Sequence, residues 1–285
     1  MARNYNRNRK NNKSRKQFQT LLLIIIAILT AGCIWAARGY ISTKEAERTS
    51  TLNQSAEDLQ MVSIPSKLPS KVKKYEGFIV DFNASNRTPN YVSWELLASE
   101  TDGPYSRNGE KFWQDEDIKN CPRTSDYTRS GYDRGHMFPA ADAKWSKEAM
   151  YQCFSMANIT PQVHALNAGA WKTLEEKERL WAKRDSAIII ISGPIYQEAD
   201  NLRIGDAGVR VPSAYFKVLF APYVENPRAI AFVYPNEHCP GNMQNYSTSV
   251  DYVEELTGFD FFATLPDDIE NKIESTFSFK EWNKR

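Results

Sequence analysis

Short apolar stretches, separated by Gly, Pro and polar residues, indicate β-strands along most of the chain. The expected strands are Tyr75–Phe82, Tyr91–Leu97, Ala187–Ser192, Ala214–Phe220 and Ile230–Tyr234, with one more leading up to Asp133. The run Ala187–Ser192 (AIIIIS) shows no polar alternation before its last residue, which is typical of a strand buried on both faces. We therefore expect this strand to be central in its sheet.

Helical spacing of apolar residues predicts four helices among these strands. They cover about 146–153, 165–183, 248–257 and 267–275, and residues 99–130 form a long polar loop punctuated by Gly and Pro. Gly258 is expected to end the third helix, and Asp267 is available to cap the fourth. The pattern predicts an α+β domain in which helices flank a central, mostly antiparallel sheet.

The first 37 residues differ from the rest in charge and hydropathy. Residues 1–16 carry seven Lys or Arg residues and no acid, and residues 17–37 are uncharged and rich in Leu and Ile. About 20 such residues can span a bilayer, and basic residues on the N-terminal side favour keeping that end in the cytoplasm. We expect a basic cytoplasmic tail (1–16) followed by a transmembrane signal anchor (17–37).

A second outcome for the same segment stays open. Thr30-Ala31-Gly32-Cys33 could be a lipoprotein cleavage site, although Thr30 replaces the usual leucine, and Cys33 would then carry the lipid. In either case the polar residues 38–70 would form a linker. Residues 71–285 would form the folded domain and would lie outside the cytoplasm, in the periplasm or at the cell surface.

Charge and cysteine content narrow the possibilities. Without residues 1–16 the chain has 29 basic and 35 acidic residues, a net charge of −6, which argues against diffuse, charge-driven binding of nucleic acid over the whole surface. Cys153 lies in an apolar setting typical of a buried thiol. Cys121 and Cys239 lie in loop-like contexts, where they could either form a disulfide or stay free.

Candidate chemistry gathers in the middle of the chain. His136 ends the run Asp133-Arg134-Gly135-His136, and Asn167 and Glu175 follow on the expected helix at 165–183. Histidine suits a general base because it titrates near neutrality. Three scattered histidines without an HExxH motif do not fit a zinc site, so a metal here would take oxygen ligands, which favours Mg²⁺. Taken alone, Asn167 also fits a helix cap, and Glu175 an exposed ion pair with Arg179.

These motifs resemble those of the DNA/RNA non-specific endonucleases, the ββα-metal or His-Me finger nucleases that include mitochondrial endonuclease G. The resemblance extends over about residues 75–270. It rests on DRGH at 133–136, NITPQ at 158–162, LNAGAW at 166–171, Leu174-Glu175, SGPIY at 192–196 and VPSAYFK at 211–217. So many matches in the same order argue against chance.

The resemblance also implies roles for individual residues. His136 matches the general base, Asn167 the direct metal ligand, and Glu175 the carboxylate that holds metal-bound water. Further matches line the site, contact the phosphate or brace the motif: Asn158, Arg179, Arg107, Arg134 and the additional basic position Arg184. The implied cofactor is Mg²⁺, with Mn²⁺ able to replace it, and the implied substrates are DNA and RNA.

Helix geometry agrees with a water-mediated role for Glu175. On a continuous helix Glu175 would lie about 80° around and about 12 Å along the axis from Asn167, too far for one small ion to bind both directly. Arg179, four residues after Glu175, would touch and orient it. The sequence thus predicts a metal-dependent endonuclease with little sequence preference. The alternative is a non-catalytic nucleic-acid binding or uptake protein on the same fold, which would not need these residues.

Overall fold

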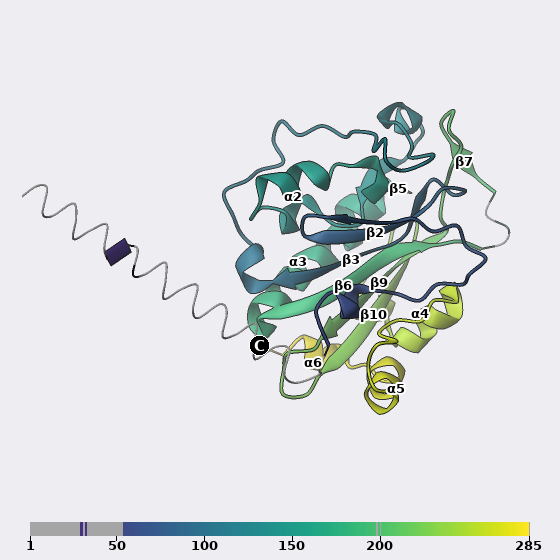
Figure 1. Ribbon diagram of the computed structural model, residues 1–285. Coiled ribbons are helices and arrows are strands. Elements are labelled where there is room, and N and C mark those ends of the chain that lie inside the picture. The colour runs from purple at the N-terminus through teal and green to yellow at the C-terminus, as the bar shows by residue number, and fades with distance from the viewer. Residues whose placement is uncertain (1–28, 31, 33–53, 198, 200, 285) are drawn as a thin grey trace, which may run out of the picture. The chain divides into compact units, whose positions relative to one another are not determined.

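The computed structural model describes residues 29, 30, 32, 54–197, 199 and 201–284 (Figure 1). The chain divides into two units, Met1–Asn53 and Gln54–Arg285. The predicted cytoplasmic tail (1–16) and most of the predicted membrane segment (17–37) lie outside the described residues. Among the helices that the structure describes, none has the length and apolar character needed to cross a membrane.

A seven-stranded sheet forms the centre of the second unit (Figure 1). Its neighbouring strands are all antiparallel. In spatial order they are β1 (Val72–Tyr75), β2 (Phe78–Asn83), β3 (Thr88–Leu97), β6 (Ala187–Ile195), β9 (Ala214–Ala221), β10 (Arg228–Pro235) and β11 (Ser247–Thr248). The predicted antiparallel sheet is confirmed. The strand with the AIIIIS run, β6, lies fourth of seven and is buried along its whole length.

Two further pairs of strands lie outside this sheet. The pair β4 (Asp133–His136) and β5 (Ile159–Gln162) carries the DRGH motif, and β7 (Arg203–Ile204) pairs with β8 (Val209–Arg210). The sequence did not predict β5. The predicted strand Tyr75–Phe82 covers most of β2 but only the last residue of β1. The structure turns at Gly77, whose φ is +87° and whose Cβ, if present, would meet the Trp145 ring at 2.8 Å.

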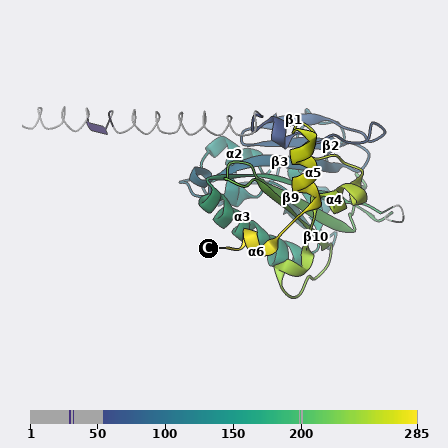
Figure 2. The same ribbon diagram turned by 90° about the horizontal axis from the view of Figure 1, so that it is seen from below.

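Helices cover both faces of the sheet (Figures 1 and 2). They are α2 (Lys147–Gln152), α3 (Lys172–Asp185), α4 (Val250–Thr257), α5 (Asp267–Ser275) and α6 (Phe279–Trp282). Successive side chains of β9 point to opposite faces. Lys217 contacts Glu178 of α3. Phe216 and Phe220 instead contact Phe259, Phe261 and Phe262, which connect α4 to α5. The α4–α5 region therefore packs on the face opposite α3.

Local capping explains most of the helix boundaries. The Ser146 and Ser249 side chains accept hydrogen bonds from backbone N–H groups in the first turns of α2 and α4. Gly258 ends α4 in the left-handed conformation (φ 71°), as predicted. The cap predicted at Asp267 is shifted by one residue. Pro266 occupies the cap position in an extended conformation, and Asp267 becomes the first helical residue.

The second half of the predicted linker (38–70) is structured. The backbones of Ser63 and Asp260 exchange two hydrogen bonds of 2.9 Å, and Leu59 is buried. Residues from Gln54 onward belong to the second unit, whereas the preceding part of the predicted linker lies outside the described residues. The buried Leu59 and the backbone pairing of Ser63 with Asp260 attach residues 54–70 to the second unit.

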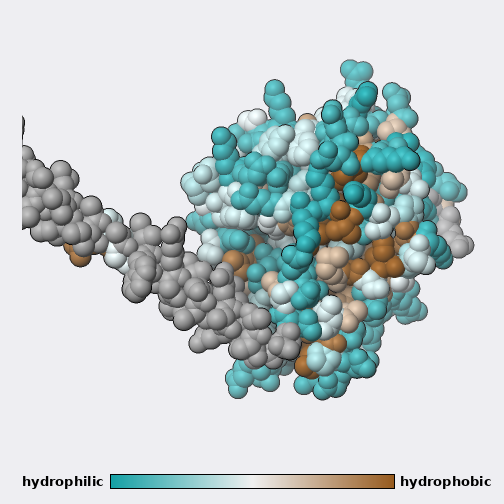
Figure 3. Space-filling view, viewed as in Figure 1, coloured by the Kyte–Doolittle hydropathy of each residue, from teal (hydrophilic) through white to brown (hydrophobic). Residues whose placement is uncertain are grey.

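The cysteines of the second unit do not form disulfides. Cys121, Cys153 and Cys239 are all free and buried. The structure thus confirms the buried thiol predicted at Cys153, and it excludes the alternative in which Cys121 pairs with Cys239. On the surface seen in Figure 3, hydrophilic residues dominate and apolar residues form small separate patches. Such a mixture is ordinary for a globular domain.

A fully buried ion pair crosses the interface between the sheet and α3. The Lys217 Nζ of β9 lies 2.8 Å from a Glu178 carboxylate oxygen, and both side chains have 0% exposure. The ammonium also lies 4.8 Å from the centre of the Trp171 ring. Taking both charges out of water costs several kcal/mol each, which their mutual attraction offsets only while both are present.

We therefore expect Lys217→Met to lower the free energy of unfolding by about 3–5 kcal/mol, because it leaves Glu178 charged and buried without a partner. The double variant Lys217→Met/Glu178→Gln should regain much of that loss. Lys172→Met should change stability little, because its ion pair with Glu176 is exposed. Urea unfolding checks this, and a Lys217→Met chain as stable as the parent would contradict the account.

Candidate active site

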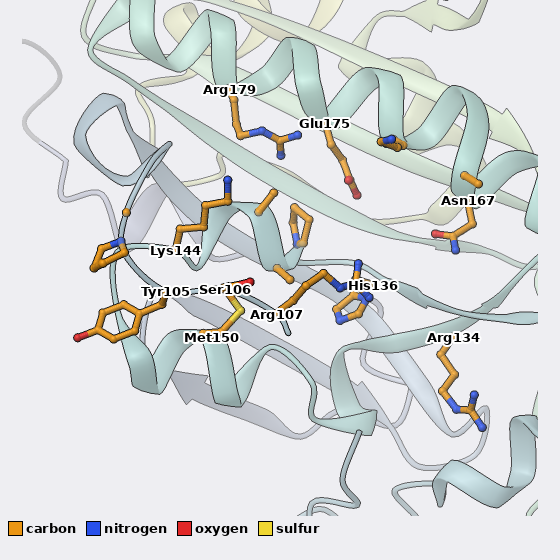
Figure 4. A pocket seen from close by; sticks show the side chains of 17 residues that line it. Tyr105, Ser106, Arg107, Arg134, His136, Lys144, Met150, Asn167, Glu175 and Arg179 are labelled. Carbon is orange, nitrogen blue, oxygen red and sulfur yellow. The ribbon is translucent and has the colours of Figure 1, made fainter. Parts of the chain in front are cut away.

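A cleft of about 620 Å³ lies where β4, the segment 103–107 and the N-terminal half of the motif helix meet (Figure 4). Its wall is formed by most of the residues that the sequence singled out. They are Arg107, Arg134, His136, Asn167, Glu175 and Arg179. Residues separated by up to 72 positions in the chain therefore face one space.

The β4–β5 pair places His136 at the edge of this cleft. In the register of the two strands His136 lies opposite Ile159, and Gly135 opposite Thr160. A Cβ on Gly135 would lie 2.1 Å from Oε1 of Gln162, a side chain with 0% exposure. The motif needs glycine here because the strand approaches a buried side chain too closely for any other residue.

Asn158 has a different place from the one predicted. It was expected to line the site, but it is fully buried (0% exposed). Its side chain accepts a 2.8 Å hydrogen bond from the Phe138 N–H and donates to the carbonyls of Phe138 (2.9 Å) and Cys153 (2.8 Å). Both the oxygen and the nitrogen of the Asn158 amide thus bind backbone groups. Asn158 therefore holds the segment that follows His136 and is a positioning residue.

The His136 ring is held by aromatic contacts. Its centre lies 5.3 Å from the Phe112 ring and 5.0 Å from the Phe154 ring. Burial, and to a lesser extent the nearby Arg107, lowers the pKa of His136 to about 3. The ring is therefore neutral at pH 7. Its Nε2 is buried and has no hydrogen-bond partner among the described residues, while the residue itself lines the cleft. A neutral imidazole at the cleft can accept a proton.

The motif helix is not continuous, in contrast to the predicted helix at 165–183. Residues Leu166–Trp171 form a π-helical turn that is interrupted at Gly169 (φ −106°, ψ −109°), and the regular helix α3 begins at Lys172. The geometry extrapolated from Asn167 to Glu175 at 100° per residue is therefore wrong. Wide turns of this kind are frequent at functional sites because they re-aim side chains.

Asn167 sits in this turn and is oriented by β4. Its Nδ2 donates a 2.9 Å hydrogen bond to Asp133, the first residue of the DRGH motif. The same carboxylate oxygen lies 2.7 Å from Nδ1 of the exposed His164. Because a carboxylate can only accept, this contact fixes the amide nitrogen toward Asp133. The Asn167 oxygen is then directed away from Asp133 and toward the cleft (Figure 4).

Glu175 also reaches the cleft from α3, without a hydrogen bond to any other described residue (Figure 4). Burial raises the pKa of Glu175 to about 7, and the Glu178 and Asp142 carboxylates add to this while Lys217 opposes it. The carboxyl group therefore lacks a counter-charge sufficient to keep it fully ionised at neutral pH. A cation in the cleft would supply that charge.

The i+4 spacing predicted that Arg179 pairs with Glu175, but the structure shows no such pair. Arg179 Nη1 lies 2.8 Å from Oδ1 of Asp142, a buried carboxylate that also accepts a hydrogen bond from Trp94 Nε1 at 3.2 Å. The prediction was wrong because Arg179 binds an acid that is 37 residues away in sequence. Arg179 is thereby fixed at the wall of the cleft rather than swinging freely.

The other basic residues divide into two groups. Arg107 and Lys144 line the cleft and form no ion pair among the described residues, so both are available to an anion. Arg134 instead points away from the other labelled side chains (Figure 4) and donates to the Thr124 carbonyl at 2.7 Å, as expected of a brace. Arg184 is bound to Asp185 and to backbone carbonyls near the C-terminus and is not among the residues that line the cleft.

The side chains at the cleft fit a hard divalent cation. Two oxygen-bearing groups, the Asn167 amide and the Glu175 carboxyl, face the space, and neither oxygen is committed to another described residue. Oxygen ligands and retained water are what Mg²⁺ prefers. No cysteine lines this cleft, and His136 is its only histidine, so the described residues do not form a zinc site here.

Sequence reasoning missed several residues of the site. Asp133 was noted only as part of the motif, although it orients Asn167. Lys172 lies three residues before Glu175, so helical spacing could have placed it at the same wall. No sequence signal identified Lys144, Tyr105 or the Phe112 and Phe154 rings around His136, because they come from loops and turns.

Comparison with known proteins gives a consistent result. Residues 55–268 match the family model described as DNA/RNA non-specific endonuclease. The chain is 31% identical over 258 residues to the mitochondrial nuclease EXOG of Xenopus laevis, covering 85% of this chain and 72% of that protein. It is 31% identical over 211 residues to the mitochondrial Nuclease 1 of Schizosaccharomyces pombe, covering 67% and 65%. A crystal structure of the EndoG/EndoGI complex contains a similar chain, with a TM-score of 0.65, 28% identity and coverage of 68% and 86%.

Metal binding should depend on Asn167 and on the Asp133 side chain that orients it. We expect Asp133→Ala to weaken Mg²⁺ binding by about 10- to 100-fold, the usual effect of losing an outer-shell partner. Asn167→Ala, which removes the expected direct ligand, should weaken it at least as much. Glu176→Gln is the matched control, because this exposed neighbour of Glu175 pairs only with Lys172. Calorimetric titration with MgCl₂ measures the affinities. Wild-type affinity in Asp133→Ala would show that the Asp133–Asn167 contact has no such role.

Proposed function

This chain belongs to the DNA/RNA non-specific endonuclease family, and we propose that it is a Mg²⁺-dependent endonuclease that hydrolyses phosphodiester bonds of DNA and RNA. The observation that carries the proposal is the convergence of three uncommitted groups on one cleft. They are the neutral imidazole of His136, the Asn167 amide oxygen and the Glu175 carboxyl. A base and two oxygen ligands on one wall are what metal-assisted hydrolysis requires.

The chain's own residues would divide the work as follows. His136 would accept the proton of the attacking water, and the Phe112 and Phe154 rings keep its imidazole in place. Asn167 would hold Mg²⁺ directly and Glu175 would hold it through water. When bound, the cation would offset the negative charge that develops on the phosphate and the leaving oxygen. Arg107, Lys144 and Arg179 would attract and orient the phosphate.

Removal of the base provides the test of this function. We expect His136→Ala to lower the rate of plasmid cleavage by about 10²-fold or more, which is typical for loss of a general base. His238→Ala is the matched control, because His238 is exposed and does not line the cleft. The His136→Ala variant should still bind DNA in a gel-shift assay. Activity within a few-fold of wild type in His136→Ala would contradict the mechanism, and a wild-type chain that binds but never cleaves would favour the uptake alternative.

We also propose that the enzyme has little sequence preference. Reading a sequence requires side chains fitted to base edges, whereas the groups at this cleft act on phosphate and water. Partial digests of one long duplex and one structured RNA should therefore give continuous ladders, with binding that weakens as salt rises. A few discrete DNA fragments with intact RNA would show that the protein recognises bases.

The location of the enzyme is a separate proposal. We propose that residues 17–37 attach the chain to a membrane, with residues 1–16 in the cytoplasm and the nuclease domain outside. Its basis is the seven basic residues that precede an uncharged apolar segment. Protease added to intact spheroplasts should digest the domain. Cys33→Ser should release it only if Cys33 carries the anchor. Protection of the domain until the cells are lysed would overturn the orientation.

A further inference from the structure

A second group of carboxylates lies on the sheet face opposite α3. Asp251 and Glu254 project from α4 and Glu274 from α5, and one oxygen from each side chain lies within 4.8 Å of the others. The α4–α5 connection packs on Phe216 and Phe220 of β9, whereas Lys217 of the same strand points toward α3 and the cleft. The cluster and the catalytic cleft are therefore separated by the central sheet.

Glu274 is the unusual member of this cluster. Its side chain is buried, with the residue only 6% exposed, and its Oε1 has no hydrogen-bond partner among the described residues. A buried carboxylate that lacks both a donor and a counter-charge is strongly disfavoured. One oxygen of the Glu274 carboxyl group lies within 4.8 Å of oxygens of the two α4 carboxylates, which would repel an ionised Glu274 if nothing lay between them.

The surroundings offer no compensation. Among the described residues, no Lys or Arg forms an ion pair with Asp251, Glu254 or Glu274. Burial raises the pKa of Glu274 to about 9, and the carboxylates of Glu254, Glu270, Asp251 and Asp260 add to the effect. All the charged groups that contribute to this pKa are carboxylates.

One of the three ligand groups is already fixed in place. Oε1 of Glu254 accepts a 2.9 Å hydrogen bond from the backbone N–H of Phe261. Phe261 in turn packs on Phe216 of β9, with ring centres 5.7 Å apart. The Glu254 carboxylate is therefore held against the body of the domain, while Glu274 approaches from the separate helix α5.

We propose that Asp251, Glu254 and Glu274 form a structural Ca²⁺ site that joins α5 to α4. Ca²⁺ binds carboxylate oxygens at about 2.3–2.6 Å, so ligand oxygens can lie up to about 5 Å apart across the ion. Mg²⁺ demands near-ideal octahedral geometry at about 2.0–2.1 Å, whereas Ca²⁺ accepts irregular sets of carboxylate oxygens. Three carboxylates from two separate helices, with oxygens within 4.8 Å of one another, therefore favour Ca²⁺. The remaining coordination positions would be filled by water.

Calorimetric titration of the full-length chain with CaCl₂ tests this site. The Asn167→Ala background is used so that the catalytic cleft contributes little binding. We expect one Ca²⁺ per chain, and binding weakened at least 10-fold by Glu274→Gln and by Glu254→Gln. Glu255→Gln, an exposed position on the same helix, is the matched control and should bind as the background does. No Ca²⁺ binding, or equal binding in Glu274→Gln, would overturn the proposal.

Thermal unfolding separates a metal site from a purely structural acidic cluster. At Ca²⁺ 100-fold above its Kd, the melting temperature should rise by roughly 5 °C or more. Glu274→Gln should abolish this rise and, without Ca²⁺, should melt higher than the parent because a buried unpaired carboxylate is gone. Its Mg²⁺-dependent cleavage should stay within about twofold of wild type. A Ca²⁺-induced rise that persists in Glu274→Gln would place the ion elsewhere and contradict the assignment.

Discussion

The position of the whole catalytic cleft depends on the close approach of β4 to β5 at Gly135, where Gln162 leaves no space for a Cβ. The short strand β4 positions two groups of the cleft. Its last residue, His136, is the proposed base, and its first, Asp133, orients the amide of Asn167, the proposed metal ligand. A shift of β4 would therefore displace both groups together. Asn158 restrains β4 against such a shift, because its side chain binds the backbone N–H and C=O of Phe138.

The domain keeps its uncommitted polar groups at the cleft and pairs the buried charges behind them. Lys217 with Glu178, and Arg179 with Asp142, neutralise one another within the layer between the sheet and α3. Glu175, next to both pairs, has no partner of its own and has a raised pKa. A divalent cation in the cleft would supply the positive charge that stabilises the ionised Glu175 carboxylate. Fixed groups of this kind stabilise charge without reorganising during the reaction, which is the main source of electrostatic catalysis.

Local signals predicted much of the fold and the members of the site. Apolar runs identified the main strands, and Gly258 marked the end of α4. Contacts between distant segments could not be predicted in the same way. Arg179 pairs with Asp142, 37 residues away in sequence, and the Asn158 side chain binds the buried backbone instead of lining the cleft. The interruption at Gly169 also escaped notice, because a single Gly within a helical pattern is compatible with an unbroken helix.

The central claim is that the cleft holds one hard cation on Asn167, beside a neutral His136. A crystal soaked in Mn²⁺, with anomalous diffraction recorded at the manganese edge, locates that ion independently of activity. The account predicts a strong peak in the cleft, bonded to the Asn167 amide oxygen at about 2.2 Å, close to the distance for Mg²⁺. Glu175 should reach the ion only through water. A peak bonded directly to Glu175 without Asn167, or no peak in the cleft, would contradict the account.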